Sequence, residues 1–297
     1  PGPRRFVTTV RVVRASRGSF TYDDHGSPWK VVAPNINVII NKSDTYRGEA
    51  SFNKGTVNIG KFEQMAAAMK SRFKIDGGKI VLDRIDLTTD GALSAATGVV
   101  DMAQWPEQTY HVQSRVDFPR MREIFFAQDK FALKGEGHFV GTFHLFKGGR
   151  ELKGRFTSEE TQLNGWRFPG LDGRLLWVRD RFEVTNAASG FYGGRINFDF
   201  SMKPLGDRTR PGMGRLDVKY QDVNLNTLTD AIPTEGLRLS GAATGRNLLE
   251  WPLGKFRERK GNGEINAAAP AGVLLQGKAL ALPPRVRPGS NPEKVAS

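Results

Sequence analysis

Residues 76–92, with the sequence DGGKIVLDRIDLTTDGA, decide the fold class of this chain. Aspartate and glycine, which favour tight turns, stand at both ends of the stretch. Between them Ile80 and Leu82 alternate with other residues, and after a change of phase Ile85 and Leu87 do the same. Alternation with a period of two predicts a β-strand with one apolar side, and the change of phase predicts a β-bulge. The stretch therefore predicts a strand joined to its neighbours by short turns.

The same pattern recurs along the chain. Alternating apolar residues occupy 139–145, 171–177, 196–202 and 216–220, and glycine-rich turns occupy 147–149 and 192–194. The composition agrees, with 34 Gly and 19 Phe among 297 residues, because these residues are typical of turns and strands. We expect an all-β chain with minor short helices, whose strands form a long, curved antiparallel meander.

Helical patterns are few and short. The spacing of Phe62, Met65 and Met69 predicts a short helix around these residues. Residues 121–126 and 225–232 each predict one or two helical turns. No other segment reaches the roughly 10 residues that a stable helix needs.

Short segments recur in the same order along the chain. The corresponding pairs are 78–82 with 173–177, 116–121 with 223–228, and 133–137 with 239–243. Units that repeat in order predict a quasi-one-dimensional sheet, which buries one face by curling into an open groove or half-pipe. We expect residues 1–245 to form this repetitive segment. Residues 246–297 should hold a last partial repeat and an irregular polar tail, which begins near Arg257.

Charge and cysteine content limit the classes of function. The 44 Lys and Arg residues exceed the 31 Asp and Glu residues, and the net charge is +13. Such a charge suits nucleic acid, an anionic membrane surface, acidic lipid head groups or simply a solvated surface, and these alternatives stay open. Because the chain has no cysteine, disulfides and thiolate zinc sites are excluded. No run approaches the roughly 18 apolar residues that cross a bilayer, and no signal-peptide pattern is present. Because the chain begins at Pro1 without an initiator Met and ends in the polar residues 287–297, we expect an excerpt or an incomplete product of a longer protein.

No segment of the sequence gives a strong signal for catalytic residues. The glycines of 135–141 lead into a predicted strand rather than a helix, which is wrong for a dinucleotide loop. Residues 23–25, Asp-Asp-His, favour a solvated hairpin turn. The acidic pair at 159–160 is interpreted as a hairpin charge pair rather than a catalytic dyad. His138 and His144 would lie about 20 Å apart on one side of a strand, too far to share a metal ion. We therefore predict no catalytic, cofactor-binding or metal-binding residues, and expect that the chain is not an enzyme.

Residues 69–92, which begin MKSRFKIDGGKIVL, resemble the AsmA/TamB superfamily. Segments 98–101 with 105–107, and the sequence FYGG at 191–194, are similar to the same family. The strand and turn at 18–24, GSFTYDD, resemble its repeating unit. The resemblance extends over residues 10–245, approximately, and rests on β-repeat patterns.

The resemblance implies a location and an activity. Members of this family are periplasmic proteins of Gram-negative bacteria, anchored in the inner membrane, with long β-grooves that reach toward the outer membrane. They are implicated in phospholipid transport, and TamB also in outer-membrane protein assembly with a BamA-like partner, TamA. For this chain the resemblance implies a phospholipid or other acyl lipid as ligand, a BamA/TamA-like partner, an anchor outside the sequence, and no nucleic acid.

Apolar strand residues are the candidates for the lining of a lipid groove. Transfer of an acyl chain of about 16 carbons out of water contributes a free energy on the order of 10 kcal/mol. A trough of Phe, Ile, Leu and Val provides the apolar surface for this transfer without catalysis. The candidates are Ile80, Leu82, Phe143, Leu175, Trp177, Ile196, Phe198, Phe200, Leu216 and Val218. Alternation places Phe198 and Phe200 on one face but does not say which face is the lumen.

Three other functions stay open. The chain is a scaffold for outer-membrane protein assembly if the edge of its sheet pairs with client strands. It is a polyanion-binding module if its net charge is concentrated on one surface. An enzyme acting on envelope polymers ranks last, because no convergent acid–base group is evident.

Overall fold

The computed structural model describes residues 9–24, 29–60, 62–127, 130–205, 211–231 and 239–269. The first eight strands are β1 (Val12–Asp24), β2 (Trp29–Lys42), β3 (Tyr46–Ile59), β4 (Met65–Asp76), β5 (Lys79–Thr89), β6 (Ala92–Asp101), β7 (Gln108–Asp117) and β8 (Leu133–Phe146). The remaining strands are β9 (Gly149–Leu163), β10 (Trp166–Val178), β11 (Phe182–Phe191), β12 (Gly194–Lys203), β13 (Met213–Asn224), β14 (Ala242–Pro252) and β15 (Lys260–Ala268). The helices of the described ranges are α1 (Phe118–Phe125), α2 (Leu225–Ala231) and the 3-10 turn η1 (Phe256–Glu258).

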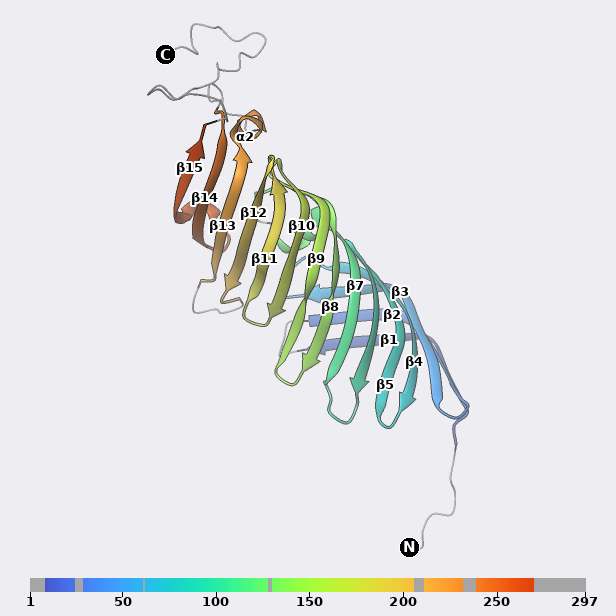
Figure 1. Ribbon diagram of the computed structural model, residues 1–297. Coiled ribbons are helices and arrows are strands. Elements are labelled where there is room, and N and C mark those ends of the chain that lie inside the picture. Colours follow the sequence, from blue (N-terminus) through green and yellow to red (C-terminus); the bar gives the residue numbers. More distant parts are fainter. Residues whose placement is uncertain are drawn as a thin grey trace, which may run out of the picture. The chain divides into compact units, whose positions relative to one another are not determined.

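The described strands form one 15-stranded sheet (Figure 1). Its strand order follows the sequence from β1 to β15, so each strand pairs with its neighbours along the chain. The sheet is open, because β1 and β15 do not pair with each other. These observations confirm the predicted all-β antiparallel meander with minor short helices.

The contacts divide the chain into two compact units. The first unit comprises Pro1–Asp129, Glu136–Phe156 and Leu176–Arg179, and the second comprises Lys130–Gly135, Thr157–Leu175 and Asp180–Ser297. Strand β14 continues across residue 245, where the sequence suggested the end of the repetitive segment.

Turns and bulges lie where their residues predicted them. Gly77 and Gly78, with φ values of 56° and 82°, form the two-residue turn between β4 and β5. Positive φ at both central positions suits the right-handed twist of a hairpin, which explains the two glycines. The register between β5 and β6 shifts between Leu82 and Ile85, so the predicted bulge is confirmed.

Both predicted strand-to-helix junctions are confirmed and have the same cap. At α1 the Asp117 carboxylate accepts a hydrogen bond from the Arg120 backbone N–H at 2.8 Å. At α2 the Asn224 side chain accepts one from the Thr227 N–H at 3.1 Å. Asp and Asn at this position stabilise a helix by satisfying an unpaired N–H group. The recurring segments 116–121 and 223–228 are therefore equivalent in structure.

Of the two other recurrences, one is kept in the structure and one is not. The segment 133–137 forms the start of strand β8, and the segment 239–243 leads into strand β14. By contrast, Gly78 lies in a turn before β5, whereas Gly173 lies inside β10, so the match of 78–82 with 173–177 is not structural.

The helix predicted around Met65 is wrong. Residues 65–69 begin strand β4, where Met65 pairs with Val57 of β3 and Met69 pairs with Leu87 of β5. Hydrogen bonds and apolar contacts with strands on both sides outweigh the helical propensity of three alanines. Short apolar runs of this kind suit either structure until the neighbouring strands are known.

The prediction of irregular structure from Arg257 onward is also wrong for the described residues. From Arg257 to Ala268 the chain is not irregular, because η1 is followed by β15, which pairs with β14. All residues of β15 are exposed, and its sequence has no alternation of apolar residues from which the strand could be predicted. The acidic pair at 159–160, interpreted as a hairpin charge pair, lies within β9, and Glu160 accepts a hydrogen bond from Arg167 of the adjoining strand β10 at 2.9 Å. The proposed turn at 23–25 lies partly outside the described residues, and the tail beyond residue 269 lies wholly outside them.

Candidate functional site

Strand register gathers apolar side chains on one face of the first unit. Leu82 of β5 pairs with Phe73 of β4 and with Gly98 of β6. Gly98 pairs with Tyr110 of β7, which pairs in turn with Phe143 of β8. Residues directly opposite in antiparallel strands point to the same side of the sheet. One row of apolar side chains therefore crosses β4 to β8, and it contains the predicted residues Leu82 and Phe143.

Neighbouring rows extend this surface. The apolar face of the first unit is the side of the sheet that carries the row described above, together with Ile80, Ile85, Leu87, Val100, Val112, Phe139, Phe52, Val57, Ile59, Met65 and Met69. The opposite side carries mostly charged and polar residues and is the polar face of the first unit. The alternation in the sequence thus becomes a separation of apolar and polar side chains across several strands.

Helix α1 lies on the apolar face of the first unit. Its Ile124 is 2% exposed and clusters with Ile59 and Met65. The ring of Phe125 contacts those of Phe62 at 5.0 Å and Trp177 at 6.1 Å between centroids, both edge to face. The predicted residue Trp177 therefore points toward α1 and the apolar face.

The sheet of the first unit curls around its apolar face. Burial raises the pKa of Tyr110 on β7 to about 12, and the nearby Tyr22 on β1 adds to the shift. These strands stand far apart in the strand order, so their side chains meet only if the sheet bends back on itself. Figure 1 shows β1 to β3 crossing behind β7. The Tyr110 hydroxyl donates a hydrogen bond to the Gln108 side-chain oxygen at 2.6 Å, which satisfies it in this setting.

The second unit has an apolar face of its own. On β12 and β13, Phe198 pairs with Val218 and Phe200 pairs with Leu216. Ile196, two residues before Phe198, faces the same side and is 5% exposed. The other four side chains are half-buried. All five predicted residues from these strands therefore share one surface, which we call the apolar face of the second unit.

Aromatic rings extend the apolar face of the second unit beyond the predicted residues. Phe200 stacks with Trp251 of β14 at 6.1 Å between centroids and meets Phe182 of β11 edge to face at 6.2 Å. Trp251 in turn meets Phe256 of η1 at 5.0 Å. Sequence reasoning missed Trp251 and Phe182, although the alternation of Leu249 with Trp251 was a usable signal.

The ten predicted lining residues are divided between the two units. Ile80, Leu82, Phe143 and Trp177 belong to the first unit, and the remaining six belong to the second. Leu175 precedes Trp177 by two residues on β10, which gives both side chains the same side of that strand. Both are half-buried, and the Arg150 guanidinium lies over the Trp177 ring, 5.7 Å from its centroid.

The opposite side of the second unit carries ion pairs between strands. The Arg246 guanidinium on β14 donates hydrogen bonds to both carboxylate oxygens of Asp217 on β13. Hydrogen bonding to Arg246 holds the pKa of the Asp217 carboxyl below its usual range. Arg215 and Glu250 form a second pair between the same strands. This side is therefore a largely polar surface, on which Leu248 and Met213 are apolar exceptions.

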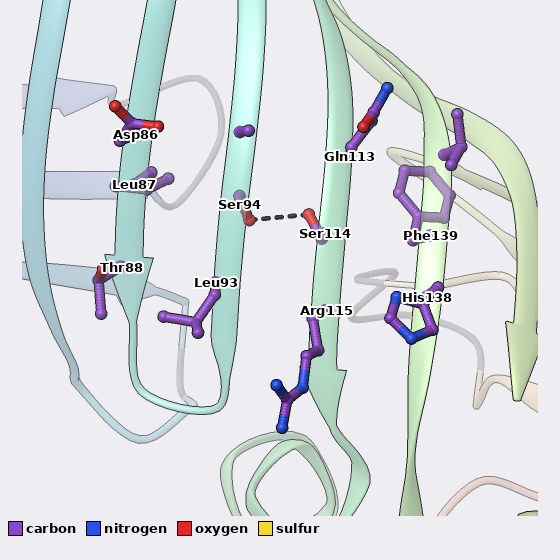
Figure 2. Close-up of a pocket in the computed structure, with 12 residues that line it drawn as sticks. Asp86, Leu87, Thr88, Leu93, Ser94, Gln113, Ser114, Arg115, His138 and Phe139 are labelled. Carbon is purple, nitrogen blue, oxygen red and sulfur yellow. Dashed lines mark hydrogen bonds between the residues drawn. The ribbon is translucent and has the colours of Figure 1, made fainter.

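A shallow depression of about 450 Å³ lies over β5 to β8 of the first unit (Figure 2). Asp86 and His138 come from the outer strands of this group, so their side chains stand about 14 Å apart at ordinary strand spacing. Ser94 and Ser114 share a hydrogen bond of 2.7 Å, which Figure 2 shows at the centre. The Arg115 Nε donates a hydrogen bond to the Glu136 carboxylate at 2.9 Å. No acid–base pair or nucleophile–base pair is formed by the residues of this depression.

Metal ligands are likewise not grouped in the part of the chain that the structure describes, where no three His, Asp or Glu side chains converge. His138 and His144 both lie on β8, and His144 binds the Glu107 carboxylate. Among the described helices, none has the length and hydrophobicity needed to span a membrane. Comparison of the chain with protein-family models, curated proteins and solved structures gives no match.

Proposed function

We propose that this chain is a non-enzymatic carrier whose apolar sheet faces shelter the acyl chains of phospholipid. The observation that carries the proposal is the apolar face of the second unit. There Phe198, Phe200, Leu216 and Val218 form paired rows and are only half-buried by the protein itself. A polar, ion-paired surface lies on the other side of the same strands.

The chemistry of this face suits an acyl chain. Each methylene that leaves water contributes about 0.8 kcal/mol, so a chain of about 16 carbons is held by on the order of 10 kcal/mol if fully sheltered. Aromatic rings such as Phe200 and Trp251 provide large contact areas without a directional requirement. Because an acyl chain presents no hydrogen-bonding groups, the face needs none in return.

The resemblance to the AsmA/TamB superfamily supports the same proposal and adds its setting. On that basis we place the protein in the periplasm of a Gram-negative bacterium, conducting phospholipid between the inner and outer membranes. The inner-membrane anchor would lie outside this sequence, and a BamA/TamA-like outer-membrane protein is the proposed partner.

One observation favours a second candidate function, that of a scaffold for outer-membrane protein assembly. Strand β15 pairs only with β14 among the described strands, and all its residues are exposed. An edge strand with free backbone groups is able to pair with a strand of another polypeptide. The lipid proposal ranks first because it accounts for the apolar faces, which strand pairing does not require.

Native mass spectrometry of the purified chain, with identification of the co-purifying lipid, tests the proposal. We expect bound phospholipid in reproducible stoichiometry, and at least ~10-fold less of it in Phe198→Arg, because a buried charge opposes apolar contact. The matched control is Asn197→Arg, since Asn197 directly precedes Phe198 on β12 and points to the polar side. Circular dichroism checks that both variants keep their β-structure.

Two outcomes would contradict the lipid proposal. Equal lipid content in Phe198→Arg, Asn197→Arg and the unchanged protein would show that the apolar face of the second unit does not hold the lipid. A lipid-free protein that crosslinks to outer-membrane proteins through β15 would favour the scaffold function instead.

A further inference from the structure

Cations gather on the polar face of the first unit. The basic patch consists of Arg14 of β1, Arg47 of β3, Lys70, Arg72 and Lys74 of β4, and Arg84 of β5. These cations outnumber the acids that lie among them, Glu49 and Asp86. A depression of about 660 Å³ lies within the patch and is lined in part by Arg14, Lys70 and Arg72.

Strand register sets like charges directly opposite each other in the basic patch. Arg72 of β4 pairs with Arg84 of β5, and Lys74 of β4 pairs with Arg47 of β3. Like charges at directly opposed positions of a sheet destabilise it. Two such pairs on one strand are therefore a cost to the fold that packing does not explain.

The acids of the region neutralise only part of this charge. Asp86 accepts hydrogen bonds from Arg84 at 2.8 and 3.0 Å, and this contact, reinforced by the charges of Arg72 and Lys70, lowers the pKa of Asp86. Within the described residues, no ion pair joins the other members of the basic patch to an acid. The patch thus keeps an excess of positive charge that faces solvent.

The second unit shows how such a pairing is ordinarily relieved. Lys219 of β13 also stands opposite Arg246 of β14. Here, however, Arg246 is bound through two hydrogen bonds by Asp217 of the neighbouring strand. In the basic patch Asp86 relieves the Arg72–Arg84 pair in the same way, by binding Arg84. The pair of Lys74 and Arg47 differs, because among the described residues neither of these cations is bound by an acid.

The form of the basic patch distinguishes among anionic partners. From β1 to β5 it spans about 19 Å at ordinary strand spacing, which is more than one phosphate group occupies. A nucleic-acid platform places aromatic rings among its cations, but Phe73, which alternates with Arg72 and Lys74, points to the apolar face. The exposed neighbours on the polar face are aliphatic instead, with Val12 at 50% and Val99 at 38% exposure.

We propose that the basic patch docks the first unit on an anionic phospholipid membrane surface. The cations meet lipid phosphates, and the aliphatic neighbours rest against the head-group region. Docking uses the polar face of the first unit and does not depend on the apolar faces holding lipid. Its failure is therefore distinguishable from failure of the carrier function.

Co-sedimentation of the full chain with lipid vesicles tests the docking. The probes are vesicles of pure phosphatidylcholine and vesicles of phosphatidylcholine with phosphatidylglycerol. The test variant combines Arg14→Gln, Lys70→Gln and Arg72→Gln. The matched control combines Arg195→Gln, Lys203→Gln and Lys219→Gln, which remove the same charge from exposed positions on the polar side of the second unit.

We expect binding to the anionic vesicles and not to the neutral ones, with loss as salt screens the charges. Each cation near the surface contributes about fivefold, so the test variant should bind about 100-fold more weakly, and the control variant should bind almost as the unchanged protein does. Equal weakening by both variants would overturn the proposal, because it would assign binding to diffuse net charge. So would equal binding to neutral vesicles, or tighter binding to duplex DNA that depends on the same three cations.

Discussion

Two glycines hold corresponding backbone positions after the two helices. Gly135 near the start of β8 has φ of 109°, and Gly241 just before β14 has φ of 107°. A Cβ atom would lie 2.3 Å from the Glu160 carbonyl oxygen in the first case and 2.0 Å from that of Ala268 in the second. Only glycine accepts both this backbone conformation and this close approach. The repeat is therefore preserved at the level of single residues as well as of elements.

Gly241→Ala is expected to destabilise the protein by at least ~3 kcal/mol, because it adds a clash with a backbone carbonyl to the strain of positive φ. The control is Gly254→Ala, where φ is 79° but nothing lies within 4 Å of the new Cβ. It should cost only about 1–2 kcal/mol, the strain alone. Urea unfolding followed by circular dichroism measures both, and equal losses would show that the close approach at Gly241 is unimportant.

Helix α1 joins distant parts of the first unit. Its apolar side packs Ile124 against β3 and β4, while Phe125 reaches Trp177 of β10. On the outer side, Arg120 donates hydrogen bonds to Glu63 and Glu123, both at 3.0 Å. Since an isolated helix of 8 residues is unstable in water, these tertiary contacts hold it in place. In this position α1 covers a portion of the apolar face that would otherwise meet solvent.

Ile124→Ala is expected to lower the free energy of unfolding by about 2–4 kcal/mol, through lost burial and the cavity that remains. It should also increase the fluorescence of an apolar dye, because a loosened α1 uncovers Ile59 and Met65. Val140→Ala on β8 serves as the control, since Val140 is 57% exposed and its truncation should change stability by less than about 0.5 kcal/mol. A stable variant without additional dye binding would show that α1 does not protect the apolar face.

At the scale of the whole molecule, the sheet has a one-dimensional order. Each described strand pairs only with its neighbours in sequence. Each strand is therefore stabilised mainly by the strands next to it rather than by one central core. Strand β15 has a partner on one side and no buried residue, whereas β13 lies between β12 and β14. Such an arrangement predicts that the edge opens far more easily than the interior strands.

Hydrogen exchange followed by mass spectrometry measures this difference. Amide groups of β15 that bond to β14 should exchange at least ~10-fold faster than those of β13, because opening β15 breaks one strand interface without exposing buried apolar residues. Peptides from β12 and β13 should exchange at similar, slow rates. Uniform protection from β12 to β15 would show that the second unit opens as a single cooperative body.

Several features of the fold follow from local sequence alone. Alternation and glycine-rich turns predicted the strands, the change of phase after Leu82 predicted the bulge, and residues 121–126 and 225–232 predicted helices where α1 and α2 lie. Prediction failed where local signals were ambiguous or missing. The alanine-rich start of β4 suits a helix or a strand, and the exposed β15 has no apolar pattern. In both places pairing with a neighbouring strand decides the structure.

The candidate site divides in the same way. The sequence by itself determined that Phe198 and Phe200 share a face, because side chains alternate along any strand. Only the tertiary structure decided which residues of different strands lie near each other, such as Arg72 opposite Arg84, or Tyr22 close enough to Tyr110 to raise its pKa. The physical reason is that alternation is a property of one strand's backbone. Register and curvature depend instead on the turns, bulges and packing that relate each strand to the others.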